Sequence, residues 1–157
     1  MKAVSLKEIK QELNTLSTIE IQELCLRLSR FKKENKELLT YLLFESSDES
    51  GYILSVKNYL DEQFELINIK SYFYIRKSVR KILTNVKKYI RYSQKKETEV
   101  ELLLYFCKKL KDFSPSIKYS VQLQNTYKRQ ILLIEKTIST LHEDLQYDYN
   151  LMLDELE

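Results

Sequence analysis

The residues with the most distinct chemistry in this sequence are cations. Residues 66–96 hold ten Lys or Arg and no Asp or Glu. At 100° per residue, most of them fall in one sector of a helical wheel: Arg76, Lys77, Arg80, Lys81, Lys87, Lys88, Arg91 and Lys95. Aromatic residues lie next to this sector, namely Phe73, Tyr74 and Tyr92. Because cationic grooves with stacking rings hold single-stranded nucleic acid, these residues are a candidate site for nucleic acid or another polyanion.

Two further interpretations fit the same charge pattern. A basic helix face is often only solvated, with no ligand. It could also pair with the C-terminal segment, because residues 140–157 hold six Asp or Glu and no Lys or Arg. Exposed ion pairs contribute only about 0–1 kcal/mol each, so such pairing, within one chain or between two copies, would select which surfaces meet more than it would add stability. The sequence leaves these three interpretations open.

Catalytic chemistry has little support in the sequence. His142 is the only histidine, and on a helical wheel it lies more than 100° from Asp144 and Asp148. Metal sites need several converging ligands, and neither a Cys-x-x-Cys nor a Glu-x-x-His pair is present. Cys25 and Cys107 lie on apolar helix faces, so we expect both to be buried, reduced thiols. The sequence predicts no catalytic residue, no metal, no cofactor and no enzymatic activity.

The residues that position these side chains are predicted to be helical throughout. One Gly and one Pro in 157 residues leave few of the tight turns that sheets need. Capping boxes mark helix starts at Ser5-x-x-Glu8, at Ser17-x-x-Glu20 and at residues 98–101. We expect helices at about 5–15, 18–31, 34–45, 51–67, 70–93, 98–113 and 120–156. The predicted fold is therefore all-α, with about seven helices in antiparallel pairs, arranged as an irregular bundle or a short helical-repeat-like array.

Two of these helices have distinct expected roles. The helix at 98–113 is apolar on two faces, which is typical of a helix sandwiched between others, so we expect it at the centre of the fold. The segment 120–156 is amphipathic throughout and is expected to form one long helix, or two nearly collinear helices that bend near Asn150. Such a helix would project from the fold or mediate self-association. We expect one domain over residues 1–157.

A short N-terminal segment carries a resemblance. Residues 13–39, "LNTLSTIEIQELCLRLSRFKKENKELL", combine a leucine, a Ser/Thr cap, acidic residues around Leu24 and a polar turn before Glu37. This pattern resembles a helical hairpin common in uncharacterised bacterial all-α proteins, although many versions carry Pro where this chain has Asn35. The resemblance implies a helix-packing motif and no activity.

The remaining expectations concern location and role. The longest apolar runs, "YLLF" and "LLLYF", are far shorter than the roughly 20 residues of a spanning helix, so a cytoplasmic protein without membrane contact is expected. Several tyrosines are predicted to lie in helix seams: Tyr41, Tyr52, Tyr59, Tyr72, Tyr89, Tyr127 and Tyr149. The first predicted function is a non-catalytic helical scaffold that binds a protein partner or a second copy through its C-terminal helix. The alternative is polyanion binding through the basic face of residues 70–93.

Overall fold

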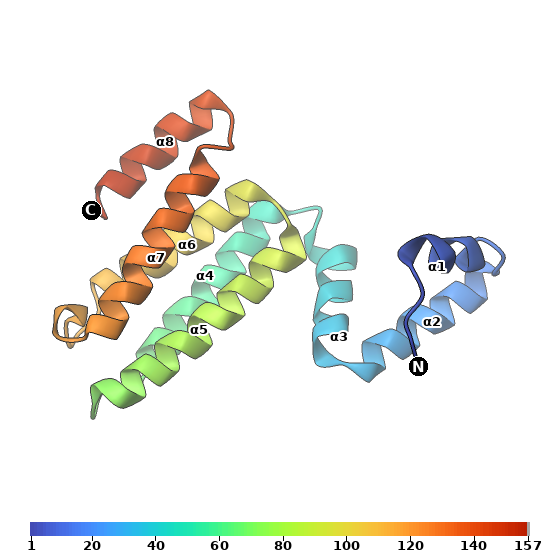
Figure 1. Ribbon diagram of the computed structural model, residues 1–157, viewed down its shortest axis with the longest axis horizontal. Helices are drawn as coiled ribbons and strands as arrows, with labels where there is room; N and C mark the ends of the chain where they lie inside the picture. Colours follow the sequence, from blue (N-terminus) through green and yellow to red (C-terminus); the bar gives the residue numbers. More distant parts are fainter. Residues whose placement is uncertain (157) are drawn as a thin grey trace. The chain divides into compact units, whose positions relative to one another are not determined.

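The computed structural model describes residues 1–156, and Figure 1 shows helices joined by short links. The eight α-helices of this range are α1 (Leu6–Leu13), α2 (Thr18–Phe31), α3 (Lys33–Thr40), α4 (Glu49–Glu65), α5 (Tyr72–Ser93), α6 (Lys96–Lys111), α7 (Val121–Ile138) and α8 (Glu143–Asp154). A π-helical turn, Tyr41–Glu45, extends α3, and a 3-10 turn, Ile117–Tyr119, precedes α7. Residues 1–156 contain no strand. The all-α prediction is confirmed.

The chain divides into two compact units, residues 1–44 and residues 45–157, which we describe separately. The prediction of one domain over the whole chain stays a prediction. In the first unit, both predicted capping boxes are confirmed. The Glu8 carboxylate accepts a hydrogen bond from the Ser5 backbone N–H at 2.8 Å, and Glu20 does the same for Ser17 at 2.8 Å. Each box satisfies helix N-terminal N–H groups that would otherwise lack a partner.

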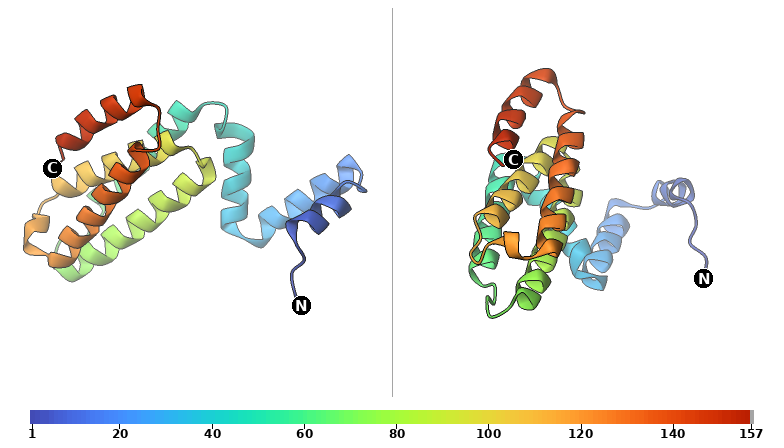
Figure 2. Two further views of the ribbon diagram at one scale, coloured as in Figure 1. Left: turned by 45° about the horizontal axis from the view of Figure 1, so that its top comes forward. Right: turned by 60° about the vertical axis from the view of Figure 1, so that its left-hand side comes forward.

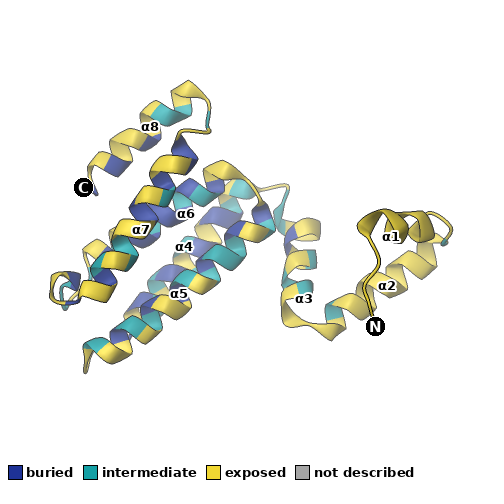
Figure 3. Cartoon of the chain, viewed as in Figure 1, coloured by how far each residue is buried: buried dark blue, intermediate teal, exposed yellow. Residues whose placement is uncertain are grey.

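The second unit is built around α6, as the sequence predicts. This helix contacts α4, α5, α7 and α8. Leu103 and Cys107 on one of its faces are fully buried, and so are Leu102 and Phe106 on the other. Figure 3 shows this unit with buried residues on every helix, whereas α1 and α2 are exposed along nearly their whole length. Burial of apolar side chains on both faces of α6 is therefore the main stabilising term of residues 45–156.

Tyrosines tie the helices of this unit together at their seams. Tyr52 donates a hydrogen bond to the Tyr89 carbonyl at 2.9 Å, and Tyr72 donates to the Ser116 carbonyl at 2.8 Å. Tyr127 donates to the Leu156 carbonyl at 2.7 Å. The seven tyrosines predicted at helix seams are all buried or half-buried. Large rings with a hydrogen-bonded hydroxyl suit these positions, because the ring is buried and the polar end is satisfied.

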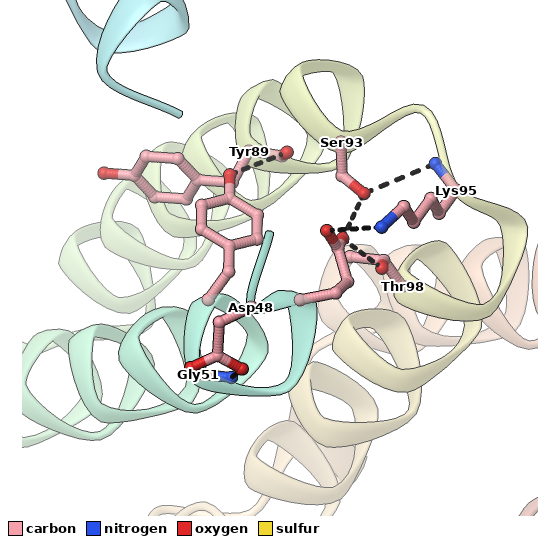
Figure 4. A network of polar contacts seen from close by, with 8 residues as sticks. Asp48, Gly51, Tyr89, Ser93, Lys95 and Thr98 are labelled. Carbon is pink, nitrogen blue, oxygen red and sulfur yellow. Dashed lines mark hydrogen bonds and ion pairs between the residues drawn. The ribbon is translucent and has the colours of Figure 1, made fainter. Parts of the chain in front are cut away.

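A carboxylate at the start of α4 holds the turn between α5 and α6 (Figure 4). Glu49 accepts hydrogen bonds from the hydroxyls of Ser93 and Thr98, the latter at 2.6 Å, and pairs with the Lys95 ammonium at 3.1 Å. The predicted capping box at residues 98–101 is therefore wrong. Helix α6 begins two residues earlier than predicted, and Thr98, which is almost fully buried, donates its hydroxyl to a different helix.

The C-terminal segment also departs from the prediction. It is neither one helix nor two collinear ones, because α7 ends at Ile138 and α8 begins at Glu143 and packs back along α7 (Figures 1 and 2). The break lies at residues 139–142, not near Asn150. Folding back buries Tyr149 and Leu153, which a straight projecting helix would leave in water.

Two smaller predictions can be judged directly. Cys107 is buried, and burial raises the pKa of its thiol to about 12, but Cys25 is exposed, so the prediction for Cys25 is wrong. Cys25 lies on the apolar side of α2, and within residues 1–44 that side is only partly covered. None of the helices formed by residues 1–156 combines the length and the apolar character needed to cross a bilayer.

Candidate binding surfaces

Helix α5 has the apolar side and the basic side that the sequence predicts. The side turned into the unit is buried at Ile75, Val79, Ile82, Val86 and Ile90. The opposite side carries six cations that we call the basic face: Arg76, Lys77, Arg80, Lys81, Lys87 and Arg91. They are exposed or half-exposed, and none of the six forms an ion pair within residues 1–156.

Two predicted members of this site, Lys95 and Lys88, make contacts with other residues of the second unit. Lys95 lies beyond the end of α5, after a left-handed C-cap at Gln94 (φ 59°), and pairs with Glu49. The Lys88 ammonium lies 5.1 Å from the centre of the Tyr89 ring, a cation–π contact. The basic face is therefore narrower than the set of cations that the sequence suggested.

The three predicted aromatic residues divide in the same way. Phe73 and Tyr74 are exposed at the start of α5, and their rings meet edge to face with centres 5.5 Å apart. Tyr92 is half-buried and packs edge-on against Tyr89, at 6.2 Å between ring centres. Tyr92 thus packs on a neighbouring ring of α5, and the exposed rings are confined to one end of the basic face.

An acidic surface lies on α8. Its exposed carboxylates, which we call the acidic face, are Glu143, Asp144, Asp148, Asp154 and Glu155. Helix α8 packs on α7 and α6, and no ion pair within residues 1–156 joins it to α5. The structure therefore does not contain the pairing of basic and acidic segments within one chain that the sequence left open.

Sequence reasoning missed a third surface, which lies in residues 1–44. No residue of α1, α2 or α3 is buried. Their large exposed apolar side chains are Leu6, Ile9, Leu13, Ile19, Ile21, Leu24, Leu26, Leu28, Phe31 and Leu38. The amphipathic pattern of these helices does not reveal this exposure, because the pattern is the same whether an apolar side is buried or exposed.

Part of this apolar surface forms a hollow, which we call the α2–α3 groove. It has a volume of about 230 Å³ and is lined by Cys25, Leu28, Ser29, Asn35, Leu38, Leu39 and Leu42. The Asn35 side-chain amide donates a hydrogen bond to the Leu28 carbonyl at 2.9 Å, which fixes the turn between the two helices. Asn35 is also the residue at which this chain departs from the helical hairpin it resembles. The groove is apolar, with few polar groups at its edge.

Another hollow, of about 460 Å³, lies over α4 and α6, beside a cluster of hydrogen-bonded and charged side chains. There, Asp61 accepts hydrogen bonds from the Tyr105 hydroxyl at 2.8 Å and pairs with Lys109 at 2.9 Å. Partial burial tends to raise the pKa of Asp61, but these hydrogen bonds and the Lys109 charge outweigh it and lower the pKa. Burial and the nearby Asp61 carboxylate raise the pKa of Tyr105 to about 12. The cluster ties α4 to α6.

The other candidate chemical groups have local roles. His142 is the N-cap of α8, where its Nδ1 accepts a hydrogen bond from the Asp144 backbone N–H at 3.3 Å. Within the described part of the chain, no three His, Cys, Asp or Glu side chains are grouped so that they could hold a metal ion. Comparison of the chain with protein families, with curated proteins and with solved structures finds no match.

Proposed function

We propose that this chain is a non-catalytic protein-interaction module that docks a partner in the α2–α3 groove. The observation that carries the proposal is that α1, α2 and α3 contain no buried residue while they expose ten large apolar side chains. Contiguous apolar surface on a soluble protein usually marks an interaction site. The partner we propose is a protein segment with apolar side chains, for example one face of an amphipathic helix.

The way in which these helices are stabilised supports the proposal. Helices α1 and α3 have eight residues each, and α2 has fourteen. Helices of this length are marginal in water, and in proteins most helix stability comes from packing of the apolar face. The capping boxes at Ser5 and Ser17 satisfy backbone groups, but they bury no apolar area. A partner in the groove would supply the missing burial, at roughly 25 cal/mol per Å² of apolar surface removed from water.

The non-catalytic part of the proposal is supported by the state of the reactive groups. The Cys107 thiol is fully buried with a raised pKa, and His142 serves as a helix cap. Cys25 is exposed, but its only neighbours in the groove are apolar or neutral polar side chains, none of which would act as a base toward it.

The test is photo-cross-linking in the cells that naturally produce the protein. A photoreactive amino acid replaces Lys36, an exposed residue of α3, in the wild-type background and in a Leu28→Ser/Leu42→Ser variant. The matched control is Leu54→Ser/Leu132→Ser, which removes two exposed leucines from the second unit. We expect one discrete cross-linked protein with the wild type and with the control, and its loss in the groove variant.

Two results would contradict the proposal. One is cross-linking of the groove only to residues 45–156 of the same chain, which would mean that the second unit covers the apolar surface. The other is the same cross-linked product in the groove variant as in the wild type. Circular dichroism of all three proteins checks that the substitutions leave the helical content unchanged.

A further inference from the structure

We infer that the acidic face of α8 in one copy of this chain docks on the basic face of α5 in a second copy. The two faces have opposite charge, both are exposed, and within residues 1–156 they do not pair with each other. The contact uses no residue of the α2–α3 groove, so it is independent of the function proposed above.

Each face carries charge that its own helix does not compensate. On α5, like charges stand four residues apart at Arg76/Arg80, Lys77/Lys81 and Lys87/Arg91, and each such pair costs a few tenths of a kcal/mol in an isolated helix. On α8, Glu143 and Asp144 lie in the first turn, where the helix dipole favours negative charge, but Asp154 and Glu155 lie at the C-terminal end, where the dipole disfavours it. The last turn has no base of its own, and the Lys111 ammonium of α6 donates to the Glu155 carbonyl at 2.9 Å, not to a carboxylate. One contact between the two faces would relieve both.

The dimensions and apolar content of the faces also match. At 1.5 Å per residue, the cations from Arg76 to Arg91 span about 22 Å, and the carboxylates from Glu143 to Glu155 span about 18 Å. Tyr147 and Leu151 are exposed among the carboxylates of α8, and Phe73 and Tyr74 are exposed at one end of the basic face. Apolar contacts would therefore accompany the ion pairs, which by themselves contribute little.

The positions of the helices determine the kind of assembly. Within the second unit, α6 contacts α5, α7 and α8, and α7 also contacts α8, so α6 and α7 lie between α5 and α8, which are at opposite edges of the unit (Figures 1 and 2). A contact between two different surfaces is heterologous and propagates from copy to copy unless a ring closes. We therefore expect oligomers larger than a dimer that grow with concentration.

A second copy fits the basic face better than single-stranded nucleic acid does. Strand binding needs a cationic groove with several ring faces available for stacking. Here Tyr92 is half-buried and packs on the Tyr89 ring, and Phe73 and Tyr74 present their rings to each other. Nucleic-acid binding would also leave the Asp148, Asp154 and Glu155 carboxylates without an ion-pair partner.

The experiment combines light scattering on the full-length protein with charge reversal. Arg76→Glu/Arg80→Glu reverses part of the basic face, and Asp148→Lys/Glu155→Lys reverses part of the acidic face. We expect the wild type to associate at low salt and to return to the 18.9 kDa monomer near 1 M salt, where the Debye length is about 3 Å. Each variant alone is expected to associate about tenfold more weakly than the wild type.

Mixing the two variants gives the decisive result. In the mixture, the reversed α5 of one variant faces the reversed α8 of the other, so we expect association to return. Lys118→Glu/Lys128→Glu, a charge reversal at two exposed lysines outside α5, and Leu28→Ser/Leu42→Ser in the groove should both associate like the wild type.

Several outcomes would overturn the inference. These are a wild type that is monomeric at every concentration in low salt, association that survives either reversal, and a mixture that stays monomeric. Salt-dependent binding of a labelled single-stranded uridine oligonucleotide by a monomeric wild type, lost in Arg76→Glu/Arg80→Glu, would assign the basic face to nucleic acid instead.

Discussion

In residues 45–156, the side chains of Leu60, Ile75 and Phe106 are withdrawn from water entirely, whereas no residue of α1, α2 or α3 is buried. Both regions are helical, and both show amphipathic patterns in the sequence. The second unit covers its apolar side chains with its own helices, around α6. The first unit relies on capping boxes and on the pairing of α2 with α3.

The difference teaches that regular helix signals and a stable tertiary structure are separate properties. A capping box is a local feature that typically contributes about 1 kcal/mol, and it forms within four consecutive residues. A core needs helices from distant parts of the chain to bury one another. The first unit has the local features without the core, and this is why we assign the docking surface to it.

The largest expected effect is the loss of a core ring. Phe106→Ala removes a fully buried ring that lies 5.9 Å from the Phe64 ring, between centres, and should lower the free energy of unfolding of the second unit by about 3–5 kcal/mol. Phe31→Ala, in α2, removes a ring that is 84% exposed and should change the free energy of unfolding of the protein by less than about 0.5 kcal/mol. Urea denaturation followed by circular dichroism measures both. Equal losses in the two variants would break the comparison between the units.

A smaller effect is expected from the carboxylate that holds the α5–α6 turn. Glu49→Ala leaves the nearly buried hydroxyls of Ser93 and Thr98 without their acceptor and removes the partner of Lys95. We expect a loss of about 2 kcal/mol of unfolding free energy, since an unsatisfied buried polar group costs about 1–3 kcal/mol. Glu62→Ala, at an exposed position of the same helix, is the control and should be nearly neutral. A neutral Glu49→Ala would mean that packing alone fixes this turn.

The smallest expected effect is a pH dependence of α1 and α2. Hydrogen bonds from Ser5 lower the pKa of Glu8, and hydrogen bonds from Ser17 lower the pKa of Glu20. A carboxylate with a lowered pKa in the folded state stabilises the fold above its ordinary pKa of 4.5, and this stabilisation is lost as the pH falls through the lowered value. Carbon chemical shifts of α1 and α2 should therefore move toward coil values as the pH falls below about 4.5.

A double variant provides the control for this pH dependence. In Ser5→Ala/Ser17→Ala the hydroxyl donors are gone, so the shift of the pKa values is reduced and the two helices should respond less to pH. If α1 and α2 kept their helical chemical shifts at low pH in the wild type, the ionised carboxylates of the capping boxes would not be needed to stabilise these helices.

The sequence predicted much of the secondary structure because its signals are local. Helix α2 begins and ends where expected, α5 lies within its predicted range, and the apolar and basic sides of α5 divide as the helical wheel indicates. Residues 98–101 show the limit of this reasoning. Thr98 and Glu101 have the spacing of a capping box, but the Thr98 hydroxyl pairs with Glu49, which is 49 residues away.

The candidate surfaces were predicted only in part. The cations of the basic face follow from the helical wheel. The pairing of Lys95 with Glu49 does not, because it is a contact between residues of different segments. The Tyr92 ring packs on the Tyr89 ring, three residues earlier in the same helix. The apolar surface of α1–α3 was missed because the apolar residues of α2 look the same in the sequence as those of a buried helix. Cys25, assigned to the core on this basis, is exposed.

The amino-acid sequence by itself determined that this protein is helical, where α2 and α5 lie, and that opposite charges are concentrated in residues 66–96 and 140–157. These properties depend on residues within one or two helical turns of each other. Only the tertiary structure decided that the C-terminal segment folds back as α8, that the basic and acidic faces lie apart, and that α1–α3 bury no residue of their own. Burial depends on which helices meet, and that is set by the total apolar area that distant segments can remove from water.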